Sequence, residues 1–314
     1  MAKNTDRGYG FEYVNILVAH KVLGTKVHTN TLSWMQNEGR NKLHSLTTKE
    51  QNEMVSASTE LMKFLKTSES WLTIPGVTVE RVRGKVGSTD VSDILFKKVN
   101  ALGEIDKELG ISLKSNHEAV KHQRISDRID IGEKWLGVPS GKQFMKDVNK
   151  IFTDFRTYCS INRIERYDQL GDQLKDSLLY RPICTIVKKL LDDTFSSPMG
   201  SSAVSHFMNY LIGSKDFYKA VASFKEKELK IISFNLRGGL GKGKILRSPQ
   251  RCLDIKIQSS SDKGFPNRVH IILDNGWEVN LRVHNASSRI ESSLKWDSQL
   301  VGIPSDAWQT RIGF

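Results

Sequence analysis

The sequence contains only three cysteines, Cys159, Cys184 and Cys252, which lie far apart and form no Cys-x-x-Cys pair. This scarcity excludes a disulfide framework and a zinc site of paired thiolates, and it favours a reducing compartment. No stretch approaches the ~18 uninterrupted apolar residues of a membrane-spanning helix. The first ten residues, MAKNTDRGYG, lack the apolar core of a secretory signal. We therefore expect a cytoplasmic protein that has no membrane partner.

Internal repeats and low-complexity tracts are also absent, which excludes a solenoid. The chain has 314 residues, and 38% of them are hydrophobic, which is enough apolar material for a packed core. At roughly 150 residues per domain, the length predicts one large domain or two interdependent ones.

Positive charge is what the sequence has in excess. There are 47 Lys and Arg residues against 35 Asp and Glu residues, which gives a net charge of +12. Such a charge predicts a polyanionic partner, and a nucleic acid is the first candidate. Charge alone does not separate a nucleic-acid enzyme from a regulatory or ribosome-associated binder.

Hydrophobic periodicity predicts a mixed α/β (α+β) chain with helical insertions and a C-terminal β-hairpin region. The Thr48-x-x-Gln51 pattern is typical of a capping box at a helix start, and Asn275-Gly276 is typical of a hairpin turn. The expected helices cover 11–24, 48–66, 117–129 and most of 141–230, and the expected strands lie within 78–99, 108–114 and 269–285.

An acidic residue opens one predicted strand, and a lysine closes the next. Asp93 precedes Ile-Leu-Phe, and Lys114 ends the run GISLK, 21 residues later. A carboxylate at a strand start can hold a divalent cation, and a nearby lysine can orient the attacking water. The spacing is typical of PD-(D/E)xK nucleases. Asp90 has the opposite parity from Asp93 on a regular strand, so we expect Asp93 to point inward.

One element of that motif differs, because Ser112 stands where the motif has Glu or Asp. Glu108 shares the strand face but lies six residues from Lys114, about 20 Å at ~3.3 Å per residue, too far to share its metal. The replacement carboxylate must come from elsewhere. Glu12, on the first helix, is the preferred candidate, and Glu118 is the second.

A basic stripe follows the lysine if 117–129 forms a helix. Its members recur at helical spacing and are His117, Lys121, Arg124 and Arg128. Such a stripe could track the DNA backbone, although a solvated basic face is the commoner explanation. Asn116, His117 and His122 also match fragments of the HNH motif, but no second histidine-rich strand or cysteine ligands accompany them.

The predicted hairpin offers polar side chains on one face. Trp277, Val279, Leu281 and Val283 alternate with Glu278, Asn280, Arg282 and His284, and Asn285 follows. Arg pairs with guanine O6 and N7, Glu can accept from cytosine N4, and a two-stranded ribbon fits the major groove. The alternative is an antiparallel sheet with one solvated face.

The segment 237–251 is rich in Gly, Lys and Arg but lacks the GxxxxGK[ST] spacing of a nucleotide-binding loop. We expect a mobile basic loop that touches DNA phosphates, or a disordered surface loop.

Several longer blocks resemble the HaeIII-type type II restriction endonucleases. They occur in the order of that family and are RGYGFEY, DVSDIL, GISLKSNHEAVKHQRIS, DIGEKWLGVP, LDNGWEVNLRVHNASS and ESSLKWDSQLVGIP. The resemblance implies a Mg²⁺-dependent endonuclease that cuts double-stranded DNA at GGCC, between the central G and C, and leaves blunt ends. It also implies a prokaryotic host whose own DNA is protected by a cognate cytosine methyltransferase.

Carried over residue by residue, the resemblance assigns Asp93 and Lys114 to the nuclease motif, Glu12 to its N-terminal acid and Ser112 to the deviant position, which belongs to the family pattern. We expect Asp93 and Glu12, aided by the Leu113 carbonyl, to bind Mg²⁺, with Asp90 as a further candidate. Lys114 would position the hydrolytic water.

The predicted organisation is a nuclease core over 1–145, with the sheet of a PD-(D/E)xK-like enzyme, and a DNA-recognition part over 146–314. We expect the two parts to be interdependent and to form one compact unit. A palindromic site cut on both strands allows a homodimer or a monomer that nicks each strand in turn.

Two functions of other classes remain as alternatives. A non-catalytic DNA-binding regulator could use the same scaffold, and Mg²⁺-dependent cleavage would separate it from the enzyme. A structural RNA-binding protein is disfavoured because no aromatic RNP-like strand is present.

Overall fold

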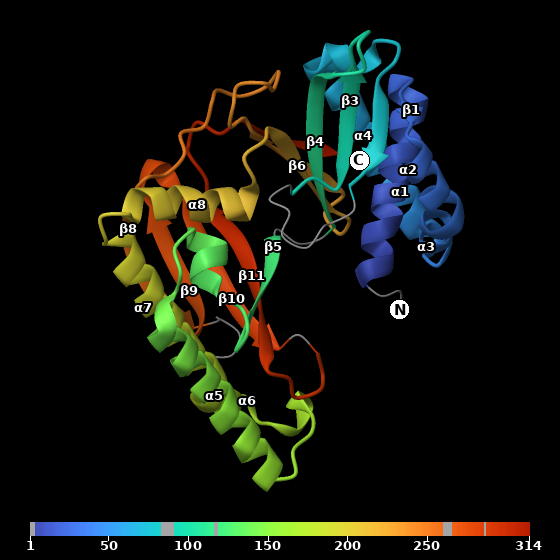
Figure 1. The fold of residues 1–314 in the computed structure, drawn as a ribbon. Coiled ribbons are helices and arrows are strands. Elements are labelled where there is room, and N and C mark those ends of the chain that lie inside the picture. Colours follow the sequence, from blue (N-terminus) through green and yellow to red (C-terminus); the bar gives the residue numbers. More distant parts are fainter. Residues whose placement is uncertain (1–3, 83–90, 116–118, 260–265, 286) are drawn as a thin grey trace. The chain divides into compact units, whose positions relative to one another are not determined.

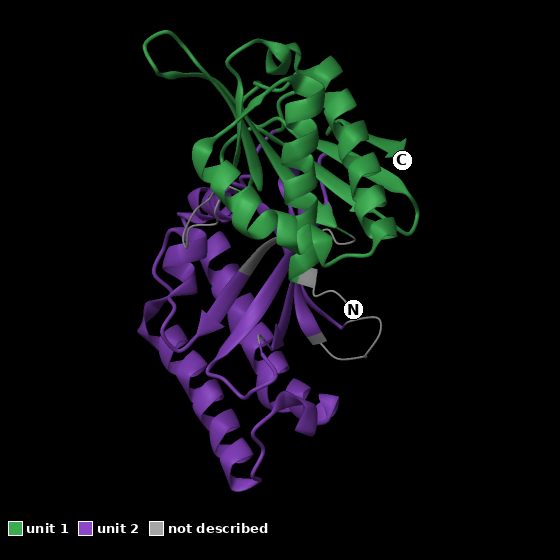
Figure 2. Ribbon diagram, turned by 90° about the vertical axis from the view of Figure 1, so that its right-hand side faces the viewer, with its two compact units in different colours: residues 1–118, 214–246, 306–314 green, residues 119–213, 247–305 purple. Residues whose placement is uncertain are grey.

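The polypeptide passes back and forth between two structural units (Figure 2). The structure is a computed structural model that describes residues 4–82, 91–115, 119–259, 266–285 and 287–314. Unit 1 comprises Met1–Glu118, Ser214–Leu246 and Asp306–Phe314, and unit 2 comprises Ala119–Gly213 and Arg247–Ser305. The sequence suggested a boundary at residue 145. The two units instead consist of several segments each, because two later segments return to the sheet of unit 1.

Unit 1 contains a seven-stranded mixed sheet in the order β1-β2-β3-β4-β6-β7-β12. Its strands are β1 (Lys26–Val27), β2 (Thr78–Arg81), β3 (Ile94–Val99), β4 (Ile105–Ser115), β6 (Phe217–Ser223), β7 (Glu228–Phe234) and β12 (Gln309–Gly313). The pairs β1–β2 and β4–β6 are parallel, and the other neighbours are antiparallel. The predicted mixed α/β architecture is confirmed.

Helices of the N-terminal segment pack on one face of this sheet. Figure 1 shows α1 and α4 in blue, and they contact each other as well as strands β2, β4 and β7. The helices are α1 (Asn4–Leu23), α2 (Thr29–Trp34), α3 (Arg40–His44) and α4 (Thr48–Ser68). Phe11 and Val14 of α1 join Ile111 of β4 in the buried core between them. Gly24 has a φ of +71°, which ends α1 with a left-handed residue where the sequence predicted its end.

The capping box of α4 lies one residue earlier than the sequence pattern suggested. The backbone amide of Glu50 donates to Thr47 Oγ1 at 3.3 Å, and the amide of Thr47 donates to Glu50 Oε2 at 3.0 Å. Thr47, with extended backbone, is the N-cap, so Thr48 is the first residue of the helix. Two overlapping Thr-x-x-Glu/Gln patterns exist in this sequence, and the local backbone selects the first.

Unit 2 contains a five-stranded antiparallel sheet in the order β5-β11-β10-β9-β8. Its strands are β5 (Ala119–Ser126), β8 (Cys252–Ser259), β9 (Pro266–Leu273), β10 (Glu278–Asn285) and β11 (Ser293–Gly302). Its helices are α5 (Gly141–Ile161), α6 (Asp172–Lys175), α7 (Arg181–Phe195) and α8 (Gly200–Ile212). Helices α5, α7 and α8 contact the strands (Figure 1). The predicted hairpin is confirmed, with Asn275 in the left-handed region at φ 59°.

The predicted helix over 117–129 is wrong, because residues 119–126 form strand β5 at one edge of this sheet. Arg124 pairs with Lys295 of β11, and its neighbours Gln123 and Ile125 are buried while Arg124 is exposed. A period of two therefore replaces the helical spacing. The pairing with β11 is more than 160 residues distant in sequence, so local periodicity could not reveal it.

The prediction that 141–230 is mostly helical is correct only as far as α8. Beyond Gly213 the chain re-enters unit 1 as β6 and β7, an antiparallel pair whose first strand is buried almost throughout. A short continuous apolar run does not distinguish a buried strand from a buried helix.

The Gly-rich segment 237–251 forms no helix or strand, and its part in unit 1 is held in place by hydrogen bonds and buried side chains. The amide of Gly241 donates to Glu69 Oε1 at 2.6 Å, and the amide of Gly239 donates to Asp216 Oδ2 at 2.7 Å. Leu240 and Leu246 are buried. Acidic side chains hold this basic segment against the unit, which contradicts the expectation of a disordered loop.

None of the helices in the described ranges combines the length and hydrophobicity that a bilayer crossing requires.

The capping box makes a stability prediction. Thr47→Ala removes a side-chain acceptor from the first turn of α4 and should lower the free energy of unfolding by about 1 kcal/mol, measured by urea denaturation. Thr48→Ala is the matched control and should change it by less than about 0.5 kcal/mol, since exposed substitutions away from caps have small effects. Equal effects of the two substitutions would contradict this assignment.

Candidate active site and candidate DNA-binding face

Asp93 stands directly before β3 and is fixed by main-chain hydrogen bonds on both sides. Its amide donates to the carbonyl of Ile111 at 2.9 Å, and its carbonyl accepts from the amide of Val82 at 2.9 Å. Its carboxylate oxygen Oδ2 accepts the amide of Leu113 at 2.6 Å. The carboxylate is therefore held at the junction of β3 and β4, with 27% of the side chain exposed.

Lys114 completes a charged pair with this carboxylate. Its Nζ lies 3.1 Å from Asp93 Oδ2, and only 14% of its side chain is exposed. Ser112, at the deviant position of the motif, is buried and directs its hydroxyl toward the same oxygen at 3.4 Å. The antiparallel register of β3 and β4, with Ile94 opposite Ile111, brings these residues together across 21 positions of sequence.

A glycine in β4 makes room for the chain beside Asp93. A Cβ on Gly110 would lie 2.0 Å from the hydroxyl of Ser92, the residue preceding Asp93. Any larger residue would displace Ser92, and with it the carboxylate, because this distance is far below a van der Waals contact.

Glu12 projects from α1 into the same region and is clamped by an arginine. Its Oε2 accepts Nε of Arg81 at 2.5 Å, and both side chains are more than four-fifths buried. The guanidinium carbon of Arg81 lies 4.7 Å from the ring centre of Tyr9 and 4.3 Å from that of Trp34. The two aromatic rings and the carboxylate together fix the planar guanidinium.

Glu12 interacts electrostatically with both members of the Asp93–Lys114 pair. Burial, followed by the negative charge of Asp93, raises the pKa of Glu12 to about 7, while Arg81 and Lys114 act in the opposite direction. Two carboxylates therefore face one another without full compensation by the nearby cations. Such a pair of acids favours an additional positive charge between them.

The oxygen donors at this position suit Mg²⁺, a hard cation that prefers carboxylates, carbonyls and water. No cluster of three or more His, Cys, Asp or Glu side chains that could hold a metal exists among the residues that the structure describes. Two carboxylates are fewer protein ligands than such a cluster would supply. This number agrees with the tendency of Mg²⁺ to keep several of its water ligands. Asp90 and Glu118, the other carboxylates considered from the sequence, lie outside the described residues.

In unit 2, the predicted alternation along β10 is present. Trp277, Val279, Leu281 and Val283 are fully buried. Arg282 is 44% exposed and donates through Nη2 to Asp297 of β11 at 2.9 Å. His284 Nε2 lies 3.0 Å from the same carboxylate, and Asn280 is buried.

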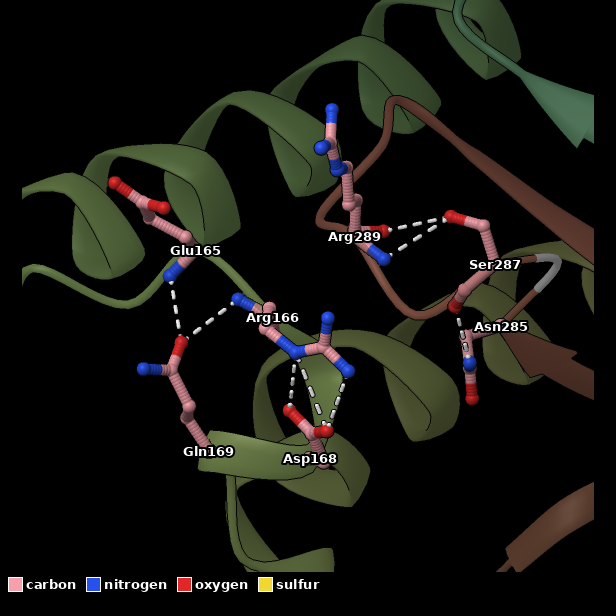
Figure 3. Close-up of polar contacts among 7 residues, drawn as sticks. All are labelled: Glu165, Arg166, Asp168, Gln169, Asn285, Ser287 and Arg289. Carbon is pink, nitrogen blue, oxygen red and sulfur yellow. Dashed lines mark hydrogen bonds and ion pairs between the residues drawn. The ribbon is translucent and has the colours of Figure 1, made fainter.

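Asn285 has a structural role in the loop that follows β10 (Figure 3). Its amide nitrogen donates to the carbonyl of Ser287 at 2.6 Å, and its Oδ1 accepts the hydroxyl of Tyr180 at 3.3 Å. The loop continues to Arg289, whose backbone pairs with that of Arg166. The amide of Asn285 is thus engaged in holding the loop.

The residues of the predicted basic stripe do not form one. His117 lies outside the described residues, and Lys121 and His122 belong to strand β5. Arg124, 52% exposed, contacts Ser293 and Glu291, while Arg128 follows the end of the strand. The helical spacing that related these positions is lost once the segment is extended.

Sequence reasoning missed two residues, Arg81 and Asp297. Arg81 lies at an inward position of β2, opposite the buried Ile94, and an arginine at such a position requires a partner. Asp297 lies directly opposite Arg282 in the register of β10 and β11. The alternation of side chains along the predicted strand could have indicated Arg81. The role of Asp297 depends on the register of β10 and β11, which the sequence alone does not reveal.

The mixed α/β sheet of unit 1 carries the Asp93–Lys114 pair from which the sequence predicted a nuclease. A family model, HaeIII restriction endonuclease, matches residues 8–304. The chain is also 35% identical over 233 residues to the type II restriction enzyme HaeIII of Haemophilus aegyptius. The aligned region covers 71% of this chain and 69% of that protein. The chain belongs to the HaeIII restriction endonuclease family, whose members are type II restriction endonucleases. No solved structure matches it.

The Arg81 clamp generates a prediction about stability. Arg81→Met leaves Glu12 buried without its cation and should lower the free energy of unfolding by about 3 kcal/mol at pH 8 in EDTA. The double variant Glu12→Gln/Arg81→Met should recover most of this loss, because no unpaired charge remains. Urea denaturation of the two variants checks the prediction, and a double variant no more stable than Arg81→Met would contradict it.

Proposed function

We propose that the protein cuts double-stranded DNA at GGCC, between the central G and C, with Mg²⁺ as cofactor and blunt ends as products. The observation that carries this proposal is the contact between Asp93 and Lys114 beside Glu12, in a chain of the HaeIII restriction endonuclease family. The net charge of +12 supports a DNA substrate.

Asp93 and Glu12 are the proposed Mg²⁺ ligands, aided by the carbonyl of Leu113 and, from outside the described residues, by Asp90. One oxygen of each carboxylate supports this role, because among the described residues the contacts of Asp93 with β4 use Oδ2 and that of Glu12 with Arg81 uses Oε2. Bound Mg²⁺ would neutralise the phosphate and lower the pKa of a water ligand.

Lys114 is proposed to orient the hydrolytic water and to offset the negative charge that develops on the scissile phosphate. Its short contact with Asp93 keeps the ammonium at the metal-binding edge, and its burial reduces competing solvation. Ser112 is proposed to assist by holding the carboxylate of Asp93 through its hydroxyl.

DNA contact is proposed for the polar residues of unit 2. Arg282 and His284, both oriented by Asp297, have the chemistry of major-groove readers, and Asn280 and Asn285 adjoin them. Lys121, His122 and Arg124 of β5 and Arg128 after it are proposed to contact the DNA backbone, although they form no helical stripe. His117, which lies outside the described residues, is proposed to contact the backbone as well.

A cytosine methyltransferase that modifies the same site is the proposed functional partner, since an enzyme that cuts GGCC would otherwise destroy its host DNA. The proposed location is the cytoplasm of a prokaryotic cell. Both strands of the palindrome would be cut by a homodimer or by successive nicking.

Cleavage of a plasmid tests the proposal. Lys114→Ala should reduce Mg²⁺-dependent cleavage by about 10²–10⁴-fold, since it removes the group that positions the water. Lys107→Ala is the matched control, because Lys107 is an exposed lysine on the same strand β4, and its cleavage rate should stay within about twofold of wild type.

The products and the cofactor are read in the same assay. Wild-type protein should give discrete blunt fragments ending at GG and CC with Mg²⁺, and no fragments in EDTA. If the protein slowed the migration of DNA in a gel but did not cut it with any divalent cation, the result would contradict the proposal and would favour a DNA-binding regulator. Equal losses in Lys114→Ala and Lys107→Ala would contradict the role of Lys114.

A further inference from the structure

The sheet of unit 2 has one polar face, on the side opposite its buried apolar residues. The polar side chains alternate with buried ones such as Val269, Ile271 and Leu281. By strand register the face comprises Asp254, Lys256 and Gln258 of β8, Arg268 and His270 of β9, Glu278, Asn280, Arg282 and His284 of β10, Lys295 and Asp297 of β11, and Arg124 of β5. Its cations outnumber its carboxylates, as expected for a surface that meets DNA.

Most side chains on this face are engaged with one another. Lys256 pairs with Asp254 at 2.6 Å. His270 contacts Gln258 at 3.0 Å and Glu278 at 3.2 Å. On the other side, Asp297 contacts both Arg282 and His284. These networks leave Arg268 between them.

Arg268 differs from Lys256, Arg282 and Arg124, each of which has a carboxylate partner. Within the described ranges no carboxylate lies within ion-pair distance of it, and its Nε is buried without a hydrogen-bond partner. It lies directly opposite Arg282 across β9 and β10. Like charges at directly opposed positions destabilise a sheet, and an unpaired buried donor adds a further cost. An acceptor on a bound ligand would offset both of these costs.

The spacing of the two arginines suits neighbouring bases. Opposed residues of an antiparallel pair have Cα atoms about 4.5–5.5 Å apart, and successive bases of one DNA strand are separated by ~3.4 Å. Each guanidinium can donate two parallel hydrogen bonds to O6 and N7 of a guanine. Two flexible side chains on adjacent strands can therefore reach two consecutive guanines.

We propose that Arg268 and Arg282 read the two consecutive guanines of one DNA strand, and that Arg268 is a specificity-determining residue. This inference rests on the proposed recognition of GGCC. Asp297 orients Arg282, while the DNA would supply the acceptor that the buried Nε of Arg268 lacks among the described residues.

The experiment measures binding in Ca²⁺, which permits DNA binding without Mg²⁺-dependent cleavage. The first probes are short duplexes that carry GGCC, or an AGCT or GATC site in its place. In further GGCC duplexes, 7-deazaguanine replaces the first or the second guanine, which removes the N7 acceptor. Arg268→Ala should weaken binding of the GGCC duplex by about 10–100-fold. It should leave nearly unchanged the binding of whichever duplex, AGCT or GATC, lacks the guanine that Arg268 reads. In this variant, 7-deazaguanine at one of the two positions should cause no further loss, whereas it should weaken wild-type binding.

Arg268→Lys keeps the charge but not the bidentate geometry, so it should bind unrelated DNA like wild type and still lose preference for GGCC. Arg311→Ala, which removes an exposed arginine of β12 in unit 1, is the charge-matched control and should keep that preference. Thermal unfolding of each variant shows whether the fold is intact.

The inference is overturned if Arg268→Ala weakens binding of the GGCC, AGCT and GATC duplexes equally and lowers the salt dependence of binding. That behaviour marks a phosphate contact. It is also overturned if Arg268→Lys keeps the full preference. Failure of the proposed function is distinguishable, because wild-type protein would then show no preference for GGCC at all.

Discussion

The carboxylate of Asp93 accepts the amide of Leu113 at 2.6 Å and the ammonium of Lys114 at 3.1 Å, and this joint contact organises the candidate active site. It depends on the antiparallel register of β3 and β4, which a shift of one residue would destroy by turning every side chain to the other face. Gly110 permits the register, since any Cβ there would meet Ser92. The chemistry of the site is thus fixed by backbone pairing before any ligand binds.

The second constraint is the burial of Glu12 close to Asp93. Arg81, enclosed by Tyr9 and Trp34, holds one oxygen of this glutamate and prevents it from turning away. In the proposed site, helix α1 would contribute the carboxylate that Ser112 cannot supply. The hydroxyl of Ser112 points toward Asp93 Oδ2 at 3.4 Å, as expected of a positioning group rather than a metal ligand.

Sequence reasoning reached the parts of the fold that local patterns determine. The helix that carries Glu12, the strands that carry Asp93 and Lys114 and the β9–β10 hairpin have clear periodicity and turn residues. The residues alone made Glu12 the preferred carboxylate and left Glu118 as an alternative, and the family resemblance then assigned Glu12 to the N-terminal acid. Strand β5 was mistaken for a helix because its partner β11 is distant in sequence. The pair β6–β7 was missed because a continuous apolar run does not distinguish a buried strand from a buried helix. The Arg81 clamp and the contact of Asp297 with Arg282 depend on such pairing as well.

The most direct test of the account is the position of a divalent cation in a crystal structure of the protein bound to a GGCC duplex with Ca²⁺. We expect one cation within about 2.3–2.6 Å of carboxylate oxygens from both Asp93 and Glu12, and of an oxygen of the scissile phosphate. The side chain of Lys114 should lie beside that phosphate. A cation bound elsewhere, or one that contacts Asp93 but no oxygen of Glu12, would contradict this prediction.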